Sequence, residues 1–319
     1  MRRAIAAALA VLALLLAAGC DRSRVDLAGL RIMVPNVPGS GYDITARTVA
    51  KALEDAKIVR DPEVFNLPGT SGIVGLQRLV YERGNAKLMM LMGLGLVASE
   101  HTVRPRFTVQ DTTPIARLVA EPGVIVVTKD SPYTSLDQLV AAWRADTAGV
   151  RVGGGSIAGG PDHLATMLLA KAVGIAPNQV GYLRYDGGGE LLAAILGRRV
   201  AFGVSGVSET ADQVRSGQLR PLAVTGAQPV TGIAAPTLRE VGIDVVSANW
   251  RGIVAPPGLS EQEVTALRQA VAKLHASPQW TVALARNSWS DAYLAGEDFA
   301  AFMRQERTRL AGVLDELGL

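Results

Sequence analysis

The segment VRVGGGSIAGGPDHLATMLLAKAVG, residues 150–174, has the pattern of a strand, a glycine-rich loop and a helix. Pro161 stands at the first position of the predicted helix and Gly174 just past its end, as is typical of helix boundaries. Leu164, Met167 and Leu168 form one apolar stripe along that helix. The segment therefore predicts one strand–loop–helix unit with a buried helix face.

The same unit recurs along the chain of 319 residues. Short apolar runs at 30–34, 64–65, 88–92 and 124–128 are typical of buried strands, and helical patterns follow most of them. The segments RVAFGVSG, LRPLAVTG and NWRGIVAPPGLS predict further strands. Strands that alternate with helices indicate an α/β fold with largely parallel sheets.

Four loops that follow predicted strands are rich in glycine: 35–42, 66–72, 153–160 and 186–189. In parallel sheets such loops lie at the carboxyl ends of the strands, where ligands collect. Glycine lets the backbone bend sharply and expose its amides, and helix N-termini add partial positive charge. Together the loops predict an anion site that needs no basic side chain.

A dinucleotide cofactor is the first anion to test. Gly153, Gly155 and Ala158 match the spacing of a dinucleotide loop, but no acidic residue lies about 20 positions beyond Gly155 to hold a ribose. A phosphate-binding Gly-Lys-Ser/Thr motif is also missing from the sequence. No cofactor is expected.

Candidates for catalysis or metal binding are few. The three histidines lie outside any His-Glu-x-x-His motif, cysteines are not paired, and no G-x-S-x-G motif occurs, so neither a zinc site nor a serine nucleophile is indicated. His163 lies near the 153–160 loop and either donates to a ligand carboxylate or braces the loop. Asp162 and Asp186 are interpreted as loop-bracing carboxylates, since a bare carboxylate would repel an anion.

The first 20 residues, MRRAIAAALAVLALLLAAGC, predict an export signal at 1–19. Cys20 follows it and resembles the lipidated cysteine of a bacterial lipoprotein box; the alternative is a soluble exported protein in which Cys20 is incidental. Removal of 1–19 lowers Lys plus Arg from 32 to 30 against 29 Asp plus Glu, a net charge near +1. With 5% aromatic residues and no basic cluster, nucleic-acid binding is not expected.

Six motifs occur in the order found in tripartite tricarboxylate transporter receptors, also called the Bug family, and the similarity runs from about residue 31 to 319. They are VPNVPGSGYDITARTVAKAL, NLPGTSGIVGLQRL, GGGSIAGGPDHLATMLLAKAVG, YDGGGELLAAILGRRVAFGVSG, LRPLAVTG and NWRGIVAPPGLS. The resemblance implies a two-lobed α/β receptor of the periplasmic-binding-protein type (type II), each lobe a mostly parallel sheet flanked by helices. Residues 26–121 and 227–319 would form the first lobe, and 122–226 the second.

In this family the loops hold a carboxylate largely through backbone amides and water, which implies contacts from 38–43, 155–163 and 186–189. Ser40, Thr70, Ser156 and Ser205 are the polar side chains expected at these loops. The full predicted ligand-binding set is Gly39, Ser40, Gly41, Tyr42, Asp43, Thr70, Ser156, Gly159, Gly160, His163, Gly187, Gly188 and Ser205. Arg251 is either a clamp for a second carboxylate or, as favoured here, a surface arginine that bridges the lobes.

The resemblance implies a monomeric extracytoplasmic receptor, lipid-anchored at Cys20, that closes on a small organic acid and serves a membrane transporter of the tripartite tricarboxylate type. No reaction is expected. Two alternatives stay open: an exported α/β enzyme that acts on a carboxylate through His163 or Ser156, and a receptor that reports to a signalling system.

Overall fold

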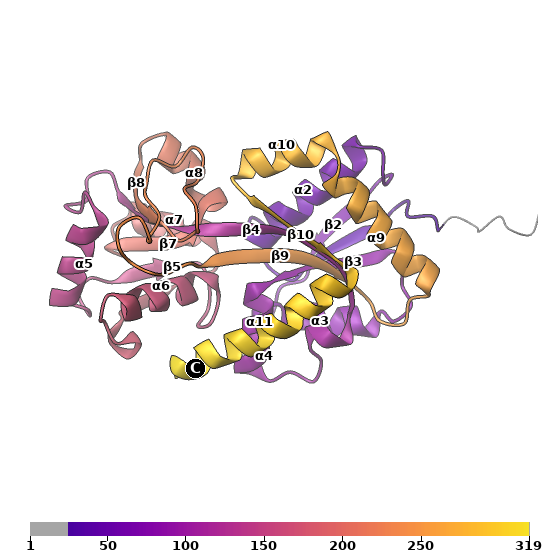
Figure 1. Cartoon of the computed structure of the whole chain (residues 1–319), viewed down its shortest axis with the longest axis horizontal. Coiled ribbons are helices and arrows are strands. Elements are labelled where there is room, and N and C mark those ends of the chain that lie inside the picture. The colour runs from indigo at the N-terminus through magenta and orange to yellow at the C-terminus, as the bar shows by residue number, and fades with distance from the viewer. Residues whose placement is uncertain (1–24, 319) are drawn as a thin grey trace, which may run out of the picture.

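Two lobes lie side by side and are joined by two long strands in this computed structural model, which describes residues 25–318 (Figure 1). The predicted export signal 1–19 and Cys20 lie outside the described residues. Each lobe has a sheet covered by helices, so the expected two-lobed α/β architecture is confirmed. No helix in the range 25–318 has both the length and the apolar character needed to cross a bilayer.

Three parallel strands form the sheet of the first lobe: β1 (Arg31–Val34) lies between β2 (Glu63–Asn66) and β3 (Leu88–Gly93). Helices cover the sheet: α2 (Gly41–Asp55), α3 (Ile73–Tyr81), α4 (Leu94–Val103), α9 (Glu261–His275), α10 (Pro278–Asn287) and α11 (Gly296–Glu316). Two short 3₁₀ turns, η1 (Thr70–Gly72) and η2 (Val109–Asp111), lie in the connections. Ala46, Val49 and Leu53 form an apolar stripe on α2 and are fully buried.

The second lobe repeats this arrangement. Strand β5 (Val152–Gly154) runs parallel to both β6 (Tyr182–Arg184) and β7 (Phe202–Gly206). Around them lie α5 (Leu136–Ala145), α6 (Pro161–Ala172), α7 (Gly188–Leu196), α8 (Val207–Arg215), η3 (Pro177–Gln179) and strand β8 (Leu219–Val224). The two lobes therefore present their strand–loop–helix units toward each other from two separate parallel ladders.

The crossing strands β4 (Thr113–Thr128) and β9 (Ala248–Ala255) are antiparallel to their neighbours. Residues 113–122 of β4 pair with β9, and part of this stretch also with β10 (Ser290–Ala295), whereas 123–128 pair with β7 and β8. The whole sheet is thus mixed, with its parallel ladders inside the lobes. The sequence predicts only 124–128 of β4, because Pro122 and Gly123 interrupt the apolar pattern of a strand of 16 residues.

Apolar side chains gather in separate clusters in the two lobes. The first lobe is centred on residues such as Ile32, Leu53 and Trp280, and the second on residues such as Trp143 and Phe202. Met89, Met90 and Met92 of β3 are fully buried and pack in the core of the first lobe. Ile233, Leu238 and Val245 pack in the second lobe, which the expected boundary at 226 had placed in the first.

We predict that Gly252→Ala destabilises the junction between the lobes. A Cβ on Gly252 would lie 2.7 Å from Phe299 Cζ and 2.8 Å from the carbonyl oxygen of Ala116, so β9 would have to shift against β4. The expected loss of unfolding free energy is about 1–3 kcal/mol, measured by urea denaturation.

Gly312→Ala is the matched control. Gly312 lies in α11, and a Cβ there would have no heavy atom within 4 Å. Alanine is the better helix former, so the variant should gain up to about 1 kcal/mol. Equal midpoints for the two variants would contradict the close packing of β9.

Candidate functional site

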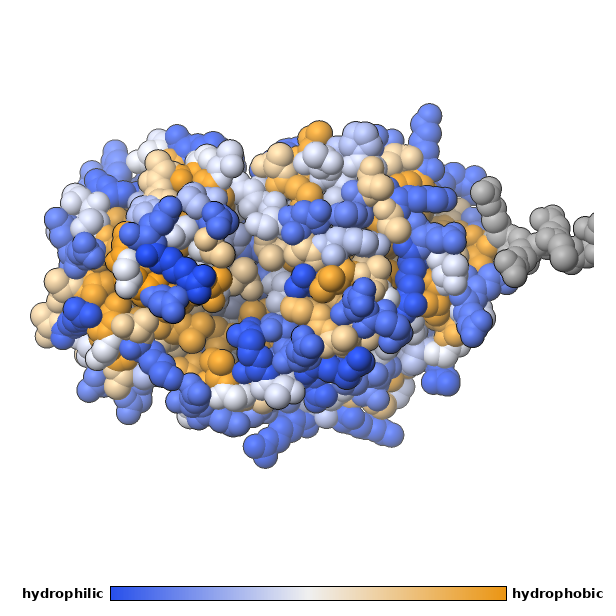
Figure 2. All heavy atoms as spheres, viewed as in Figure 1, coloured by the Kyte–Doolittle hydropathy of each residue, from blue (hydrophilic) through white to orange (hydrophobic). Residues whose placement is uncertain are grey.

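A cavity of about 310 Å³ lies between the lobes, above the crossing strands. The four glycine-rich loops singled out in the sequence all line it, after β1, β2, β5 and β6. The surface view shows a notch between the two lobes at the upper edge of the face drawn (Figure 2). The volume is at the lower end of the range for small-molecule sites.

The predicted site residues divide into two groups. Those that line the cavity are Ser40, Gly41, Tyr42, Thr70, Ser156, Gly160 and Gly187. Those that lie behind the lining are Gly39, Asp43, Gly159, His163, Gly188 and Ser205. In the second group, Gly39 bonds Asp43 and Gly159 bonds His163, whereas Ser205 of β7 donates to Glu209.

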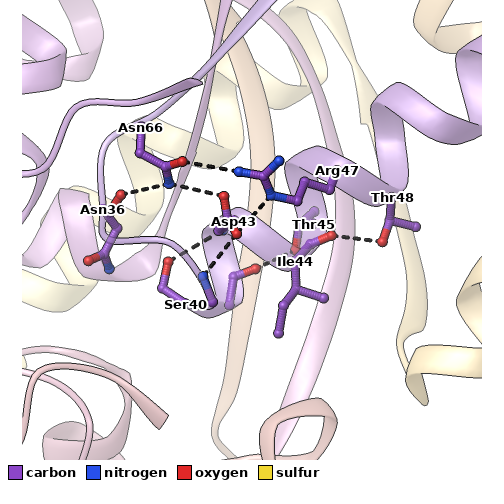
Figure 3. Close-up of polar contacts among 10 residues, drawn as sticks. Asn36, Ser40, Asp43, Ile44, Thr45, Arg47, Thr48 and Asn66 are labelled. Carbon is purple, nitrogen blue, oxygen red and sulfur yellow. Dashed lines mark hydrogen bonds and ion pairs between the residues drawn. The ribbon is translucent and has the colours of Figure 1, made fainter. Parts of the chain in front are cut away.

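The first loop is braced by Asp43, in the first turn of α2 (Figure 3). Its carboxylate accepts hydrogen bonds from the Gly39 amide at 2.9 Å, from Arg47 Nε at 3.0 Å and from Asn66 Nδ2 at 3.0 Å. Burial alone would raise the pKa of Asp43, but these donors outweigh burial and lower it. Ser40 caps α2 by accepting from the Asp43 amide at 3.4 Å. Asp43 therefore positions the loop and is not a ligand contact in this geometry.

The second loop has an equivalent brace. Asp162, in the first turn of α6, accepts from the Gly155 amide at 2.8 Å. Ser156 Oγ accepts from the amides of Asp162 and His163 at 3.1 and 3.3 Å, and Tyr182 donates its hydroxyl to the Ser156 carbonyl at 2.9 Å. The interpretation of Asp162 as a loop-bracing carboxylate is thus supported by geometry. Ser156 both lines the cavity and caps α6.

Several loop amides that the sequence analysis assigned to an anion instead donate hydrogen bonds to side chains of the protein. The amides of Gly39, Gly155 and Gly159 donate to Asp43, Asp162 and His163, respectively. The prediction that these glycines offer their amides to a ligand is wrong for this geometry, because side chains from the first turn of the next helix reach back to them. A glycine-rich sequence alone does not reveal that side chains of the following helix bond the loop amides.

His163 is buried and lies behind the loop. Its Nδ1 accepts from the Gly159 amide at 3.3 Å, and its ring meets the Tyr182 ring edge-on at 4.9 Å. Burial lowers its pKa to about 4, so the imidazole is neutral. Ser156 Oγ contacts the backbone of His163 and not its ring. Of the two interpretations of His163, the geometry favours the loop brace.

Sequence reasoning missed several polar residues of the lining. Arg251 lines the cavity with only 2% of its surface exposed, so the prediction of a surface arginine is wrong. It forms a buried ion pair with Glu121 and donates from Nη1 to Thr45 Oγ1 at 3.2 Å. Glu209 and Asn249 also line the cavity. An arginine inside an apolar strand was the available signal for Arg251; Glu121 and Glu209 lie in segments without a distinctive motif.

Two half-buried carboxyl groups of the second lobe, those of Asp162 and Glu209, have raised pKa values. Burial, followed by the nearby charge of Glu209, raises the pKa of Asp162 well above its ordinary value. Burial, followed by the charge of Glu121, raises the pKa of Glu209. The cavity lining thus combines amide, hydroxyl and guanidinium donors with several carboxylates, as is typical of a site for a small polar ligand.

Comparison with known proteins agrees with this architecture. The model of the family "Tripartite tricarboxylate transporter family receptor" matches residues 44–319. The chain belongs to this receptor family. Protein BugT of Bordetella pertussis is 26% identical over 91% of this chain and 89% of its own length.

Solved structures share the fold. A TctC solute binding protein from Polaromonas is 27% identical, with a TM-score of 0.66 over 91% of this chain and 98% of that one. A Rhodopseudomonas palustris protein, MatC with bound malate, is 19% identical, with a TM-score of 0.77 over 90% and 99%. Another R. palustris protein, Rpa4515 with adipate, is 24% identical, with a TM-score of 0.81 over 91% and 97%.

We predict that His163→Asn reduces the loss of stability in acid. The unfolded chain takes up a proton on this histidine near pH 6.5, but the folded receptor does so only near pH 4, so His163 removes stability as the pH falls between these values. The contribution is on the order of 3 kcal/mol. An asparagine Oδ1 can still accept from Gly159 but does not titrate.

The measurement is urea denaturation of both proteins across this pH range. The raised pKa values of Asp162 and Glu209 act in the opposite direction in both, so the difference between the two proteins isolates His163. An unchanged acid slope in the variant would contradict the assignment of a neutral, buried imidazole.

Proposed function

We propose that this receptor binds a small organic acid in the cavity between its lobes and delivers it to a membrane transporter of the tripartite tricarboxylate type. The observation that carries the proposal is the convergence of four glycine-rich loops, two from each lobe, on one cavity of about 310 Å³. The family relationship supports the transport role. Malate and adipate in the names of two neighbours support a small carboxylate as the ligand.

The carboxylate of the ligand is proposed to lie at the N-terminus of α2. Gly41 and Tyr42 are the first residues of this helix of 15 residues, and both line the cavity. Amides of a first helical turn have no partner inside the helix and carry partial positive charge. Arg251 lies directly behind Gly41, since a Cβ on Gly41 would be 3.0 Å from Arg251 Cζ. Both place positive or partial positive charge on this side of the cavity.

Closure of the lobes is the proposed mechanical step. Residues 26–121 and the segment from 248 onward would move as the first lobe, and 122–247 as the second, with β4 and β9 as the hinge. Contacts across the cleft support such a closed arrangement: Lys171 of α6 pairs with Glu316 of α11 at 2.7 Å, and Leu164 packs in the apolar cluster of the first lobe. A ligand that contacts both lobes would stabilise this arrangement.

The receptor is proposed to act outside the cytoplasm as a monomer, without catalysing a reaction. Residues 1–19 would direct export, and Cys20 would carry the lipid anchor. The engagement of Ser156 Oγ by backbone amides, and of His163 Nδ1 by Gly159, supports a binding role over nucleophilic catalysis.

Titration calorimetry with a panel of organic acids tests the function. Gly41→Val should weaken binding of the best acid at least about tenfold, because the side chain would overlap the Arg251 guanidinium and cover the α2 amides. Gly189→Ala, in the first turn of α7 with no heavy atom within 4 Å of its Cβ, is the control and should keep full affinity. Unchanged affinity in the Gly41 variant, or turnover of a bound acid, would contradict the proposal.

The anchor has its own test. Cys20→Ser should abolish incorporation of radiolabelled palmitate in a bacterial host and release the receptor from the membrane fraction. Labelled, membrane-bound protein in the Cys20→Ser variant would contradict lipidation at this residue. Binding of the acid in solution should be unaffected, which separates anchoring from recognition.

A further inference from the structure

The cavity proposed for an acid is itself lined by carboxylates. Glu121, Asp162, Asp186 and Glu209 all line it, and the buried cation among the described lining residues is Arg251. Arg184 also lines the cavity, but it is exposed and pairs with Asp186 at 2.8 Å. The described residues 25–318 contain no group of three or more histidine, cysteine or acidic residues arranged to hold a metal ion. The excess of negative groups therefore needs another explanation.

Glu121 and Asp162 both accept hydrogen bonds within the second lobe or its crossing strand. Glu121 is fully buried; Oε1 accepts from the Ser208 amide at 2.7 Å, and the other oxygen pairs with Arg251. Asp162 accepts from the Gly155 amide at 2.8 Å. Arg251 is therefore engaged by two partners within the protein: its charge is paired with Glu121, and it also donates a hydrogen bond to Thr45. Glu209, like Asp162, is left without a cation of its own.

Glu209 lies in the first turn of α8 and reaches toward the opposite lobe. Ser205 Oγ donates to its Oε2 at 2.7 Å, and the amide of Gly41 in the first lobe lies near the carboxyl group. A Cβ on Gly188 would lie 2.8 Å from Glu209 Cδ, so the loop before α7 packs tightly against the carboxyl group. Glu209 is thus a positioned acceptor beside the α2 N-terminus, where the ligand carboxylate is proposed to lie.

A second acceptor faces the same cavity. Asn249 Oδ1 is buried and has no hydrogen-bond partner among the described residues. Asn249 pairs with Glu121 across the β4–β9 ladder and lies two positions from Arg251, on the same face of β9. A buried acceptor without a donor costs free energy until a ligand supplies one. The cavity lining therefore offers acceptors for hydrogen-bond donors of a ligand, in addition to the amides proposed to bind its carboxylate.

We propose that Glu209, assisted by Asn249, selects organic acids that carry a hydrogen-bond donor, a hydroxyl or an ammonium group, beside the carboxylate. This inference rests on the proposed function. An acid without a donor would place only CH₂ or a second negative charge against Glu209. A site built to accept from a substrate donor discriminates strongly against the analogue that lacks it, because its buried acceptors then stay unpaired.

Calorimetry on matched acids tests the inference. Malate and aspartate differ from succinate by one hydroxyl or one ammonium group, and citrate differs from tricarballylate by one hydroxyl. The wild-type receptor should bind a donor-bearing member of at least one set at least about tenfold more tightly than its unsubstituted analogue. Preference for aspartate over malate would identify the donor as ammonium, and the reverse would identify it as hydroxyl.

Two variants assign the preference to Glu209. Glu209→Met keeps the approximate length of the side chain but removes both acceptors, so the preference should fall to within about threefold of unity. Glu209→Gln keeps one acceptor without the charge and should give an intermediate ratio, with the larger loss for aspartate. Asp212→Asn removes an exposed carboxylate one turn further along α8 and should leave the ratio unchanged.

Different results would contradict the inference, the assignment to Glu209 and the proposed function. If succinate and tricarballylate bind as tightly as their substituted analogues, the inference is wrong while the proposed function stands. If a preference exists but persists unchanged in both Glu209 variants, the assignment to Glu209 is wrong. If no organic acid binds the folded wild-type receptor, the proposed function itself fails.

Discussion

The antiparallel pairing of β4 with β9 is the constraint on which the rest of the structure depends. The ladder runs from Thr113 opposite Ala255 to Pro122 opposite Ala248, and β4 then continues into the second lobe. Both lobes are therefore attached to one pair of strands, and the cavity lies where the strands leave one lobe for the other. Arg251 and Glu121 lie on these adjacent strands and form a buried ion pair that lines the cavity. Breaking a buried pair by removing one partner is strongly destabilising, so these two residues are coupled.

In each lobe an acidic side chain fixes the glycine-rich loop that precedes a helix. A glycine-rich loop enters a helix, and an acidic residue of the first helical turn bonds an amide of the loop: Asp43 with Gly39, and Asp162 with Gly155. The brace in the first lobe is supported by Arg47, whereas the brace in the second lobe has no such cation and burial raises its pKa. The loops are thus preorganised by their own helices, which reduces the entropy lost when a ligand binds.

The cavity combines this rigidity with a mixed electrostatic lining. The N-terminus of α2 and Arg251 provide attraction for an anion, while Glu209 and Asn249 provide acceptors beside them. A lining of this kind recognises more than net charge, because a ligand must match donors and acceptors at fixed positions. Specificity in such sites comes from the cost of leaving a buried group unpaired.

The sequence by itself determined the repeated strand–loop–helix units and the four loops that meet at the cavity, because each is a local pattern of apolar spacing, glycine and capping residues. Only the tertiary structure decided which amides those loops keep for a ligand, because Asp43, Asp162 and His163 return to bond them. It also decided the continuity of β4 through Pro122 and the burial of Arg251 against Glu121, 130 positions apart in the chain. Contacts of that separation depend on strand pairing and lobe packing, and no spacing rule within one segment encodes them.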